Sequence, residues 1–385
     1  MKNDPPLMID LFAGAGGLSL GFKNAGFKVI CAIEIDDWAC DTYEKNHVGV
    51  KVIRKDISQI PDGFFLKFKN ISVIAGGPPC QGFSIAASNR RKKNDKRNSL
   101  YKEFLRVVKL VQPKVVLIEN VKELEKFKNE HGKKILDDIY ETLSVQGYSV
   151  KHYLLNAKDF GVPQNRTRFF LIAAKHALPE LTSKKKNFKH LTLWQAISDL
   201  PEVKPWEHNE NDVFNYNCEP NNLYQKMMRT GTKKVYNHIS MRHTERLIKR
   251  FEHIRLIQNN NCVGGDFAPR KRGNPDAVSN KHYSQNHRRL IPDEPSPTIT
   301  ASFYSSFIHP YQNRNLTVRE ASRLQSFPDT YVFCGKRTTL SKKLLAKKGI
   351  HEDIHLDQFN QVGNAVPPLL AEYLAKKIMH SFGVQ

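Results

Sequence analysis

The sequence predicts a doubly wound, mostly parallel α/β sheet with a second, smaller and less regular domain. Two observations carry this prediction. Short apolar runs alternate with helical segments over roughly the first 175 residues, and these runs end beside glycines or acids. After about residue 181 the alternation stops, and Asn, His and short basic runs become more frequent. We therefore expect the first part to form the sheet and the later part to form the second domain.

The elements of the expected sheet follow one another in order. The expected strands are LMIDLF (7–12), FKVICAIE (27–34), ISVIA (71–75) and KVVLIE (114–119), and the expected helices are 18–25, 37–46 and 99–111. Ligands of such sheets bind at the carboxyl ends of the strands, so Gly14, Glu34, Cys80 and Glu119 are expected at one edge. A last amphipathic helix is expected within 361–382, entered through Pro367 and Pro368.

Composition limits the class of protein. A chain of 385 residues suggests two or three domains, at roughly 100–200 residues per domain. Hydrophobic residues at 40% and charged residues at 25% are typical of a globular protein and argue against a disordered or coiled-coil chain. No apolar stretch approaches the roughly 20 residues that span a bilayer, and the start has no signal-peptide pattern. We expect a soluble, cytoplasmic protein.

The charge indicates a polyanionic partner. The formal net charge is +22, and residues 181–290 hold 20 Lys and Arg against 10 Asp and Glu. Further basic stretches are 84–102 and 336–348. Such an excess favours nucleic acid as the partner, although a basic surface that only keeps the protein soluble is the alternative before any motif is considered.

The segment DLFAGAGGLSLGF (10–22) is a glycine-rich connection between a strand and a helix. Small residues there allow a cofactor to approach the backbone. A nicotinamide dinucleotide fingerprint would need Gly at position 19, where this chain has Ser, so that class is disfavoured. Glu34, about 20 residues on, can bond ribose hydroxyls. An ordinary tight turn and a solvated strand end explain these two features equally well.

The segment GGPPCQGFS (76–84) is more specific. It places Cys80 after two prolines at a strand end, on a rigid turn where a thiolate can act as a nucleophile. The next strand delivers Glu119, which can protonate or hydrogen-bond a heterocycle held against Cys80. The alternatives are a buried structural cysteine and an ordinary acid at a strand end.

Eight segments of the chain belong together in this order: DLFAGAGGLSLGF, the acid in AIEID, KDISQI (55–60), GGPPCQGFS, IENV, QNRTRFFLIA (164–173), RNLTVREASRLQSFPD (314–329) and QVGNAVPP (361–368). In their content and order they resemble a known family, the cytosine-C5 DNA methyltransferases of the bacterial type. The resemblance covers nearly the whole chain.

The resemblance implies a Rossmann-like, S-adenosylmethionine-dependent fold and a set of site residues. Cys80 is the implied nucleophile, Glu119 contacts the flipped base at a ring nitrogen, Arg166 and Arg168 assist, and Gln164 supports the arrangement. The implied S-adenosylmethionine-binding residues are Phe12, Ala13, Gly14, Gly16, Gly17, Glu34, Asp56, Ile57, Pro79, Leu100, Asn364 and Val366. The segment 314–329, with Arg314, Thr317, Arg319, Glu320 and Arg323, is expected to organise the smaller domain.

The resemblance also implies three parts of the chain. Residues 1–180 form the catalytic and S-adenosylmethionine-binding domain, 181–330 form the target-recognition domain, and 331–385 return to complete the catalytic domain. The implied substrate is double-stranded DNA containing a short specific sequence, from which the target cytosine is flipped out. The protein would be the modification half of a restriction–modification system, with a cognate restriction endonuclease as a functional partner. We expect a monomer without a membrane association.

No metal is expected. HEDIH (351–355) matches the zinc-protease pattern HExxH, but it directly follows Gly349 and Ile350 and separates two of the family-like segments, which favours an insertion loop. Two other functions remain as alternatives. One is a cytosine-C5 methyltransferase acting on tRNA, against which the long basic segment 181–290 and the absence of a Cys-Phe-Thr signature argue. The other is a non-catalytic DNA-binding protein, against which the intact Cys80, Glu119 and QNRTR argue.

Overall fold

The structure is a computed structural model whose residues form two compact units. It describes residues 4–79, 99–129, 132–181, 189–205, 207, 209, 211–256, 258, 260–271, 274–279, 286–340, 344–345, 348–350 and 353–382. Unit 1 comprises Met1–Gly161, Arg166–Phe188 and Ala365–Gln385, and unit 2 comprises Val162–Asn165 and Lys189–Asn364. Each unit is described by itself below.

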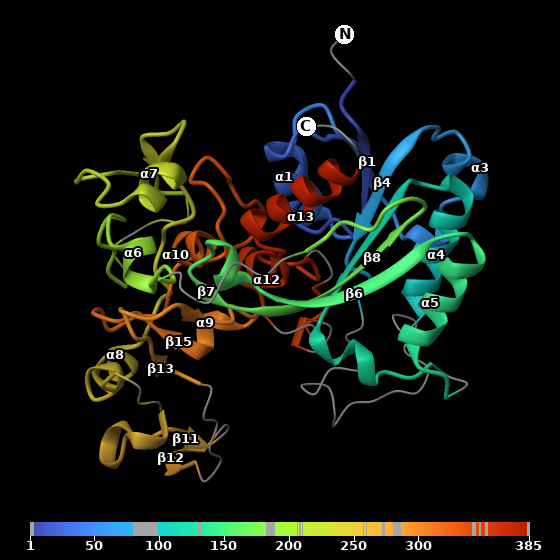
Figure 1. The fold of residues 1–385 in the computed structure, drawn as a ribbon. Helices are drawn as coiled ribbons and strands as arrows, with labels where there is room; N and C mark the ends of the chain where they lie inside the picture. Colours follow the sequence, from blue (N-terminus) through green and yellow to red (C-terminus); the bar gives the residue numbers. More distant parts are fainter. Residues whose placement is uncertain are drawn as a thin grey trace. The chain divides into compact units, whose positions relative to one another are not determined.

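Unit 1 is built on a seven-stranded sheet with the order β3-β2-β1-β4-β5-β8-β6 (Figure 1). The strands are β1 (Leu7–Leu11), β2 (Lys28–Glu34), β3 (Lys51–Arg54), β4 (Ile71–Gly76), β5 (Val115–Asn120), β6 (Ser149–Asn156) and β8 (Thr167–Ala174). β1 pairs in parallel with β2 and β4, and β4 with β5, whereas β8 is antiparallel to both β5 and β6. The predicted mostly parallel α/β sheet is confirmed.

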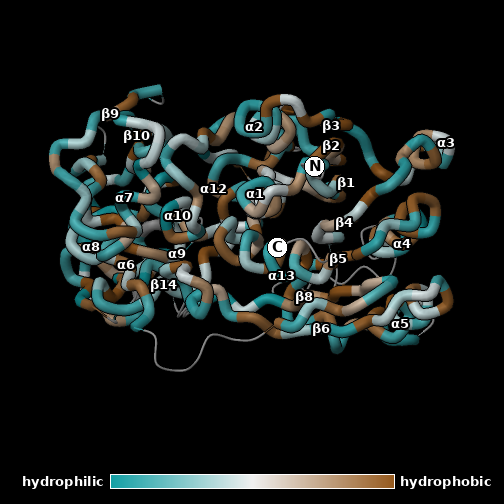
Figure 2. Tube along the Cα trace, turned by 45° about the horizontal axis from the view of Figure 1, so that its top comes forward, coloured by the Kyte–Doolittle hydropathy of each residue, from teal (hydrophilic) through white to brown (hydrophobic). Residues whose placement is uncertain are grey.

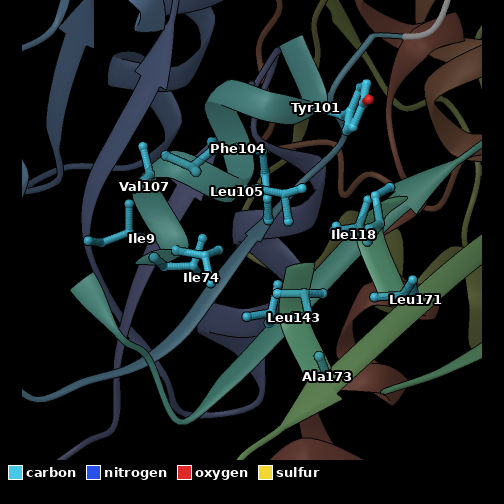
Figure 3. Close-up of a cluster of buried hydrophobic side chains, with 14 of the residues drawn as sticks. Ile9, Ile74, Tyr101, Phe104, Leu105, Val107, Ile118, Leu143, Leu171 and Ala173 are labelled. Atoms are coloured by element: carbon cyan, nitrogen blue, oxygen red, sulfur yellow. The ribbon is translucent and has the colours of Figure 1, made fainter. Parts of the chain in front are cut away.

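The inner strands are hydrophobic because both of their faces are covered (Figure 2). On one face, Ile9 and Ile74 pack with Phe104 of α4 and Leu143 of α5 in the main hydrophobic cluster (Figure 3). Side chains alternate along a strand, so Asp10, between Ile9 and Leu11, points to the opposite face. The helices on the cluster side include α3 (Asp62–Phe65), α4 (Leu100–Val111) and α5 (Ile135–Val145).

Helices α1 (Gly17–Asn24) and α13 (Pro368–Ser381) lie side by side in unit 1 (Figure 1). Their approach is close at Gly21, where an added Cβ would lie 2.4 Å from the Cβ of Ala371. The C-terminal segment therefore belongs to the same unit as the N-terminal strand.

The predicted C-terminal helix, entered through Pro367 and Pro368, is confirmed, because α13 begins at Pro368 with Pro367 as its N-cap. The segment 361–382 is not one helix, because α12 (Gln358–Asn364) ends before α13 begins at Pro368. Pro367 stands between them, and a proline disfavours helical backbone at the residue before it.

The other expected elements of unit 1 occur within one residue of their predicted ends. Helix α2 has the predicted bounds Asp37–Asn46, and its first turn is capped by Asp36, whose side chain accepts from Ala39 N at 3.0 Å. Short 3₁₀ turns connect the larger elements: η1 (Ile57–Gln59), η5 (Lys122–Lys126) and η6 (Ala157–Phe160).

Unit 2 consists of short helices and two-stranded pairs in the part of it that is described. Its helices are α6 (Leu193–Ile197), α7 (Leu223–Arg229), α8 (Glu245–Glu252), α9 (Phe303–Ser306), α10 (Val318–Leu324) and α12, with 3₁₀ turns η7 (Asn260–Cys262) and η8 (Gly265–Phe267). Its strands are β7 (Gln164–Asn165), β9 (Phe214–Asn215), β10 (Lys234–Val235), β11 (Arg270–Lys271), β12 (Asn274–Val278), β13 (Arg288–Arg289), β14 (Ser296–Pro297) and β15 (Phe307–Ile308). This matches the expectation of a less regular second part.

The centre of unit 2 is α10, whose residues are all buried. Arg323 is fully buried, and its guanidinium donates to Asp329 at 2.6 and 2.7 Å and to Asp199 at 2.9 Å. Arg314 makes a bidentate pair with Glu320 at 2.6 and 2.9 Å. The predicted structural role of this segment is confirmed, because its charged side chains are satisfied inside the unit.

The chain returns to unit 1 later than the sequence suggested. Residues up to Asn364 belong to unit 2, whereas the return was expected at 331. Hydrogen bonds explain the difference: Gln325 donates to Val362 O at 2.8 Å, and Asn237 donates to Phe333 O at 2.9 Å. Within the described parts of both units, no helix is long and apolar enough to cross a membrane.

Replacing Arg323 tests the ion-pair centre of unit 2. In Arg323→Met, two carboxylates stay buried without their main cation, and we expect the free energy of unfolding to fall by about 3–5 kcal/mol. Urea denaturation measures it, with Lys233→Met, at an exposed lysine, as the control. A loss below about 1 kcal/mol in Arg323→Met would contradict a central role for this network.

Candidate active site

The connection after β1 adopts the backbone conformation that its glycines allow. Gly14 and Gly16 have φ values of 51° and 84°, and Phe12 also has a positive φ, of 58°. Side chains disfavour this left-handed region, so glycine suits the turn. The Ala13 amide donates to Ile33 O at 3.1 Å, which ties the turn to β2. Gly17 then begins α1.

Glu34, at the end of β2, holds this turn. One carboxyl oxygen accepts from Gly14 N at 2.8 Å, and the other accepts from the amides of Ile35 and Asp36 at 2.8 and 2.9 Å. Burial raises the pKa of Glu34, and the three N–H donors oppose that rise. The residue expected to meet ribose hydroxyls therefore also fixes the glycine-rich backbone.

A buried polar chain beneath the turn was not found from the sequence. Asp10 is fully buried and accepts from the Ser19 hydroxyl at 2.6 Å, and Ser19 in turn accepts from the Tyr43 hydroxyl at 2.6 Å. Among the described atoms, the second carboxyl oxygen of Asp10 has no hydrogen-bond partner. Burial raises the pKa of Asp10 to about 7. The available signal was a lone acid inside the apolar run LMIDLF.

Two of the expected cofactor residues lie in the turn after β3. The Asp56 carboxylate accepts from Ser58 N at 2.9 Å and caps η1. The Ile57 side chain is buried, and its carbonyl accepts from Arg106 at 2.9 Å. Arg106, which the sequence did not single out, thus braces this turn from α4.

Pro79 and Leu100 flank a part of the chain outside the described residues. Both are half-buried, Pro79 after β4 and Leu100 at the start of α4. Residues 80–98, which include Cys80 and most of the basic stretch 84–102, lie outside the described residues. The carbonyl of Pro78, two residues before Cys80, accepts from the Asn120 side chain at 3.0 Å, which links the end of β4 to the end of β5.

Glu119 and Arg168 form an ion pair next to that link. Arg168 Nε lies 3.3 Å from a Glu119 carboxyl oxygen, and the two side chains are 17% and 13% exposed. Burial raises the pKa of Glu119, while the charges of Arg168 and Arg166 oppose the rise. An added Cβ at Gly77 would lie 3.0 Å from the other Glu119 carboxyl oxygen, so the glycine leaves room for it.

The other expected residues are distributed between the two units. Arg166 is 1% exposed and donates to the backbone carbonyl of Ala365 at 3.1 Å, and burial lowers its pKa. Val366 follows directly and is half-buried, whereas Asn364 is exposed at the end of α12 in unit 2. Gln164 is buried in unit 2, where it donates to Leu324 O at 3.1 Å.

The structure therefore brings together a subset of the expected residues. Gly14 contacts Glu34 at the carboxyl ends of β1 and β2, and Glu119 near the carboxyl end of β5 contacts Arg168 at the amino end of the antiparallel strand β8. Among the described residues, no three His, Cys, Asp or Glu side chains form a group that could hold a metal ion.

Comparison with known proteins shows the family of the chain that carries these residues. The family model described as C-5 cytosine-specific DNA methylase matches residues 7–380. The chain belongs to this family. The methylase is 46% identical over 382 residues to the type II methyltransferase M.DdeI of Desulfomicrobium norvegicum, with 97% of this chain and 89% of that protein covered. It is 35% identical to M1.HphI of Haemophilus parahaemolyticus, with 96% and 86% covered.

Solved structures agree with this membership. A prophage-encoded candidate DNA modification methyltransferase from E. coli matches the methylase with a TM-score of 0.74 at 27% identity, covering 98% of this chain and 99% of that one. S. pombe Dnmt2 shares the fold, with a TM-score of 0.60 at 18% identity and coverage of 98% and 99%. The methylase is a DNA (cytosine-5-)-methyltransferase of a family that uses S-adenosylmethionine as methyl donor.

The buried Asp10 carboxyl gives the methylase a testable pH dependence. Its pKa is raised in the folded state, so folding is favoured while the carboxyl is protonated, and this contribution is lost as pH rises from about 4 to about 7. We expect Asp10→Asn to remove about 2–3 kcal/mol of the stability change between pH 5 and pH 7.5. Denaturant titrations at the two pH values measure it.

Asp4→Asn, at an exposed aspartate, is the matched control and should keep the pH dependence of the wild type. An unchanged pH dependence in Asp10→Asn would show that the Asp10 carboxyl is ionised in the folded protein across this range.

Proposed function

We propose that the methylase transfers a methyl group from S-adenosylmethionine to C5 of a cytosine rotated out of double-stranded DNA, through a covalent bond between Cys80 and C6. The observation that carries the proposal is the Glu119–Arg168 pair at the carboxyl end of β5. β5 pairs in parallel with β4, and the chain reaches Cys80 four residues after β4 ends at Gly76. Nucleophile and carboxyl thus follow neighbouring strand ends.

Glu119 supports the first step. C5 of cytosine is a weak nucleophile, so the Cys80 thiolate adds to C6 and the electron pair of the C5–C6 double bond becomes available at C5. A protonated Glu119 donates to N3 of the base and makes this addition easier. Its raised pKa favours that protonated form, and Arg168 fixes the carboxyl from 3.3 Å away.

The remaining steps restore both the enzyme and the aromatic base. S-adenosylmethionine, when bound, would supply an electrophilic methyl group: the new bond from C5 to the methyl carbon replaces the bond from that carbon to sulfur, and S-adenosylhomocysteine would be the leaving group. A base removes the proton from C5, the C5–C6 double bond forms again, and the bond from C6 to Cys80 breaks to release the thiolate. Because a stacked base cannot be reached from both faces, rotation out of the duplex precedes these steps, at a cost of a few kcal/mol.

The residues around the glycine-rich turn fit the proposed methyl donor. An added Cβ at Gly14 would have no described atom within 4 Å, so the backbone there is open to a ligand. The Glu34 carboxyl suits the ribose hydroxyls of the donor, and the nearby buried Asp10 carboxyl suits the positive charge of its sulfonium and ammonium groups. The residues proposed to hold it are Phe12, Ala13, Gly14, Gly16, Gly17, Glu34, Asp56, Ile57, Pro79, Leu100, Asn364 and Val366.

Double-stranded DNA and a restriction–modification role complete the proposal. The net charge of +22 supports a duplex substrate. The relatives M.DdeI and M1.HphI are named type II methyltransferases, which supports a role as the modification partner of a restriction endonuclease. We propose that residues of unit 2 provide the sequence recognition and that the protein acts as a monomer.

Covalent trapping tests the nucleophile. A duplex with 5-fluorocytosine at the target lacks the C5 proton, so elimination is blocked and the bond to Cys80 persists. We expect wild-type protein and Cys218→Ser, altered at an exposed cysteine of unit 2, to give a complex stable in denaturing gels. Cys80→Ser should give none. A denaturant-stable complex with folded Cys80→Ser would disprove the assignment.

The pH dependence of turnover tests Glu119. Activity needs a deprotonated Cys80 and a protonated Glu119, so the wild-type rate falls as pH rises through the raised pKa of Glu119. We expect Glu119→Gln to lose about 10²–10⁴-fold in single-turnover rate and to lack this alkaline decline. Glu141→Gln, at an exposed glutamate, is the control. A full rate in Glu119→Gln would exclude the proposed proton donor.

A further inference from the structure

The positive charge of unit 2 is concentrated in one segment, residues 241–290, which we call the basic module. It holds 11 Lys and Arg against 4 Asp and Glu. The preceding residues 189–240 hold 6 of each, and residues 291–364 hold 9 basic and 7 acidic residues. A polyanion approaching unit 2 is therefore attracted mainly to the basic module.

The basic module has a small core that orders it. Phe251 of α8, Ile254 and Val263 form a buried cluster together with Ile308 of β15, which lies outside the module in sequence. In Figure 1, α8, β11 and β12 lie at the same end of unit 2, away from α7. Helix α8 and the residues that follow it are thus anchored by buried side chains.

Three arginines of the module are used in building it. Arg246 donates to Asp266 O and Ala268 O at 2.6 and 2.9 Å, and Arg250 donates to Phe267 O at 2.6 Å. Arg289 donates to the carbonyls of Ile254 and Phe251, both at 2.5 Å. These three guanidinium groups already bond to backbone carbonyls. Contacts with a partner are therefore expected from other basic residues of the module.

The hairpin of β11 and β12 presents charged side chains that are not used in holding the module together. Lys271 pairs opposite Asn274, the pairing becomes irregular towards Arg270, and Asp276 stands two residues after Asn274 on β12. All three side chains are exposed. Within the described residues, the Lys271 ammonium and the Asp276 carboxylate have no side-chain partner, while the Asn274 side-chain oxygen accepts from Asp276 N at 3.1 Å.

We propose that the β11–β12 hairpin enters the DNA major groove and that Lys271, Asn274 and Asp276 determine which base sequence is methylated. This inference rests on the proposed function, since it takes duplex DNA as the substrate. Two-stranded ribbons fit the major groove, where lysine reads guanine, asparagine reads adenine and aspartate accepts from the cytosine amino group. Arg255, also exposed, contacts phosphate.

Asp276 is the most informative member of this set. A carboxylate brought near DNA phosphates is repelled by them. If Asp276 lies against DNA, a hydrogen-bond donor on the DNA has to offset this repulsion. The exocyclic amino group of cytosine supplies such a donor in the major groove. Arg270 donates to the Asp276 carbonyl at 3.1 Å and thereby fixes the backbone that carries this carboxylate.

Matched triple variants test the hairpin. The first is Lys271→Gln/Asn274→Ala/Asp276→Ala, and the control is Lys233→Gln/Asn211→Ala/Glu219→Ala, which likewise removes one ammonium, one amide and one carboxylate at exposed residues of unit 2 outside the module. Bisulfite sequencing of plasmid DNA reads the methylated context of each. We expect the hairpin variant to lose about 5- to 100-fold of its discrimination at one or more base positions, and the control to keep the wild-type context. An unchanged context in the hairpin variant overturns the proposal.

A single variant gives a second test that changes no volume. Asp276→Asn replaces an acceptor by an amide that suits adenine, so one position of the context should shift from cytosine towards adenine. Retention of the wild-type preference at every position would remove Asp276 from the set of reading residues.

The salt dependence of duplex binding separates failure of this inference from failure of the proposed function. It is measured with a random-sequence duplex and no turnover. Arg255→Gln/Lys271→Gln should lower the slope of log affinity against log salt by about 1–2, whereas Lys226→Gln/Lys233→Gln should leave it unchanged. Wild type that methylates no DNA contradicts the proposed function, while equal slopes in the two double variants contradict the hairpin as the DNA-contacting element.

Discussion

The site depends on the burial of three carboxyl groups at one edge of a parallel sheet. Asp10, Glu34 and Glu119 stand at the carboxyl ends of β1, β2 and β5, and burial raises the pKa of each. Each is compensated differently: Asp10 by the Ser19 hydroxyl, Glu34 by three backbone amides and Glu119 by Arg168. An uncompensated carboxylate at this edge would be costly, so these partners fix the geometry around it.

The same principle acts in unit 2 with a different purpose. There, buried charges are paired with one another: Arg314 bonds Glu320, and Arg323 bonds Asp199 and Asp329. Ion pairs whose hydrogen bonds are all satisfied stabilise the fold. A carboxyl with an unbonded oxygen, such as Asp10, can still bind a proton or interact with a bound cation. This difference separates the structural charges of unit 2 from the chemical ones of unit 1.

The sequence predicted the sheet well because its signals are local. Apolar runs bounded by glycines and acids located β1, β2, β4 and β5 to within one residue, and the predicted helix 37–46 has the bounds of α2, whereas β3, β6 and β8 were not predicted. Features that depend on contacts distant in sequence were missed. The bond from Arg166 to Ala365 O spans 199 positions, and the membership of residues 331–364 in unit 2 depends on bonds such as that from Gln325 to Val362. No local pattern encodes such pairings.

The most direct test of the account is base-resolution bisulfite sequencing of plasmid and host DNA after expression in a cell that lacks cytosine methylation. The account predicts protected cytosines confined to one short sequence context. Absence of any protected cytosine, from folded protein that binds S-adenosylmethionine in solution, would contradict it and would direct attention to RNA or to DNA binding without methyl transfer.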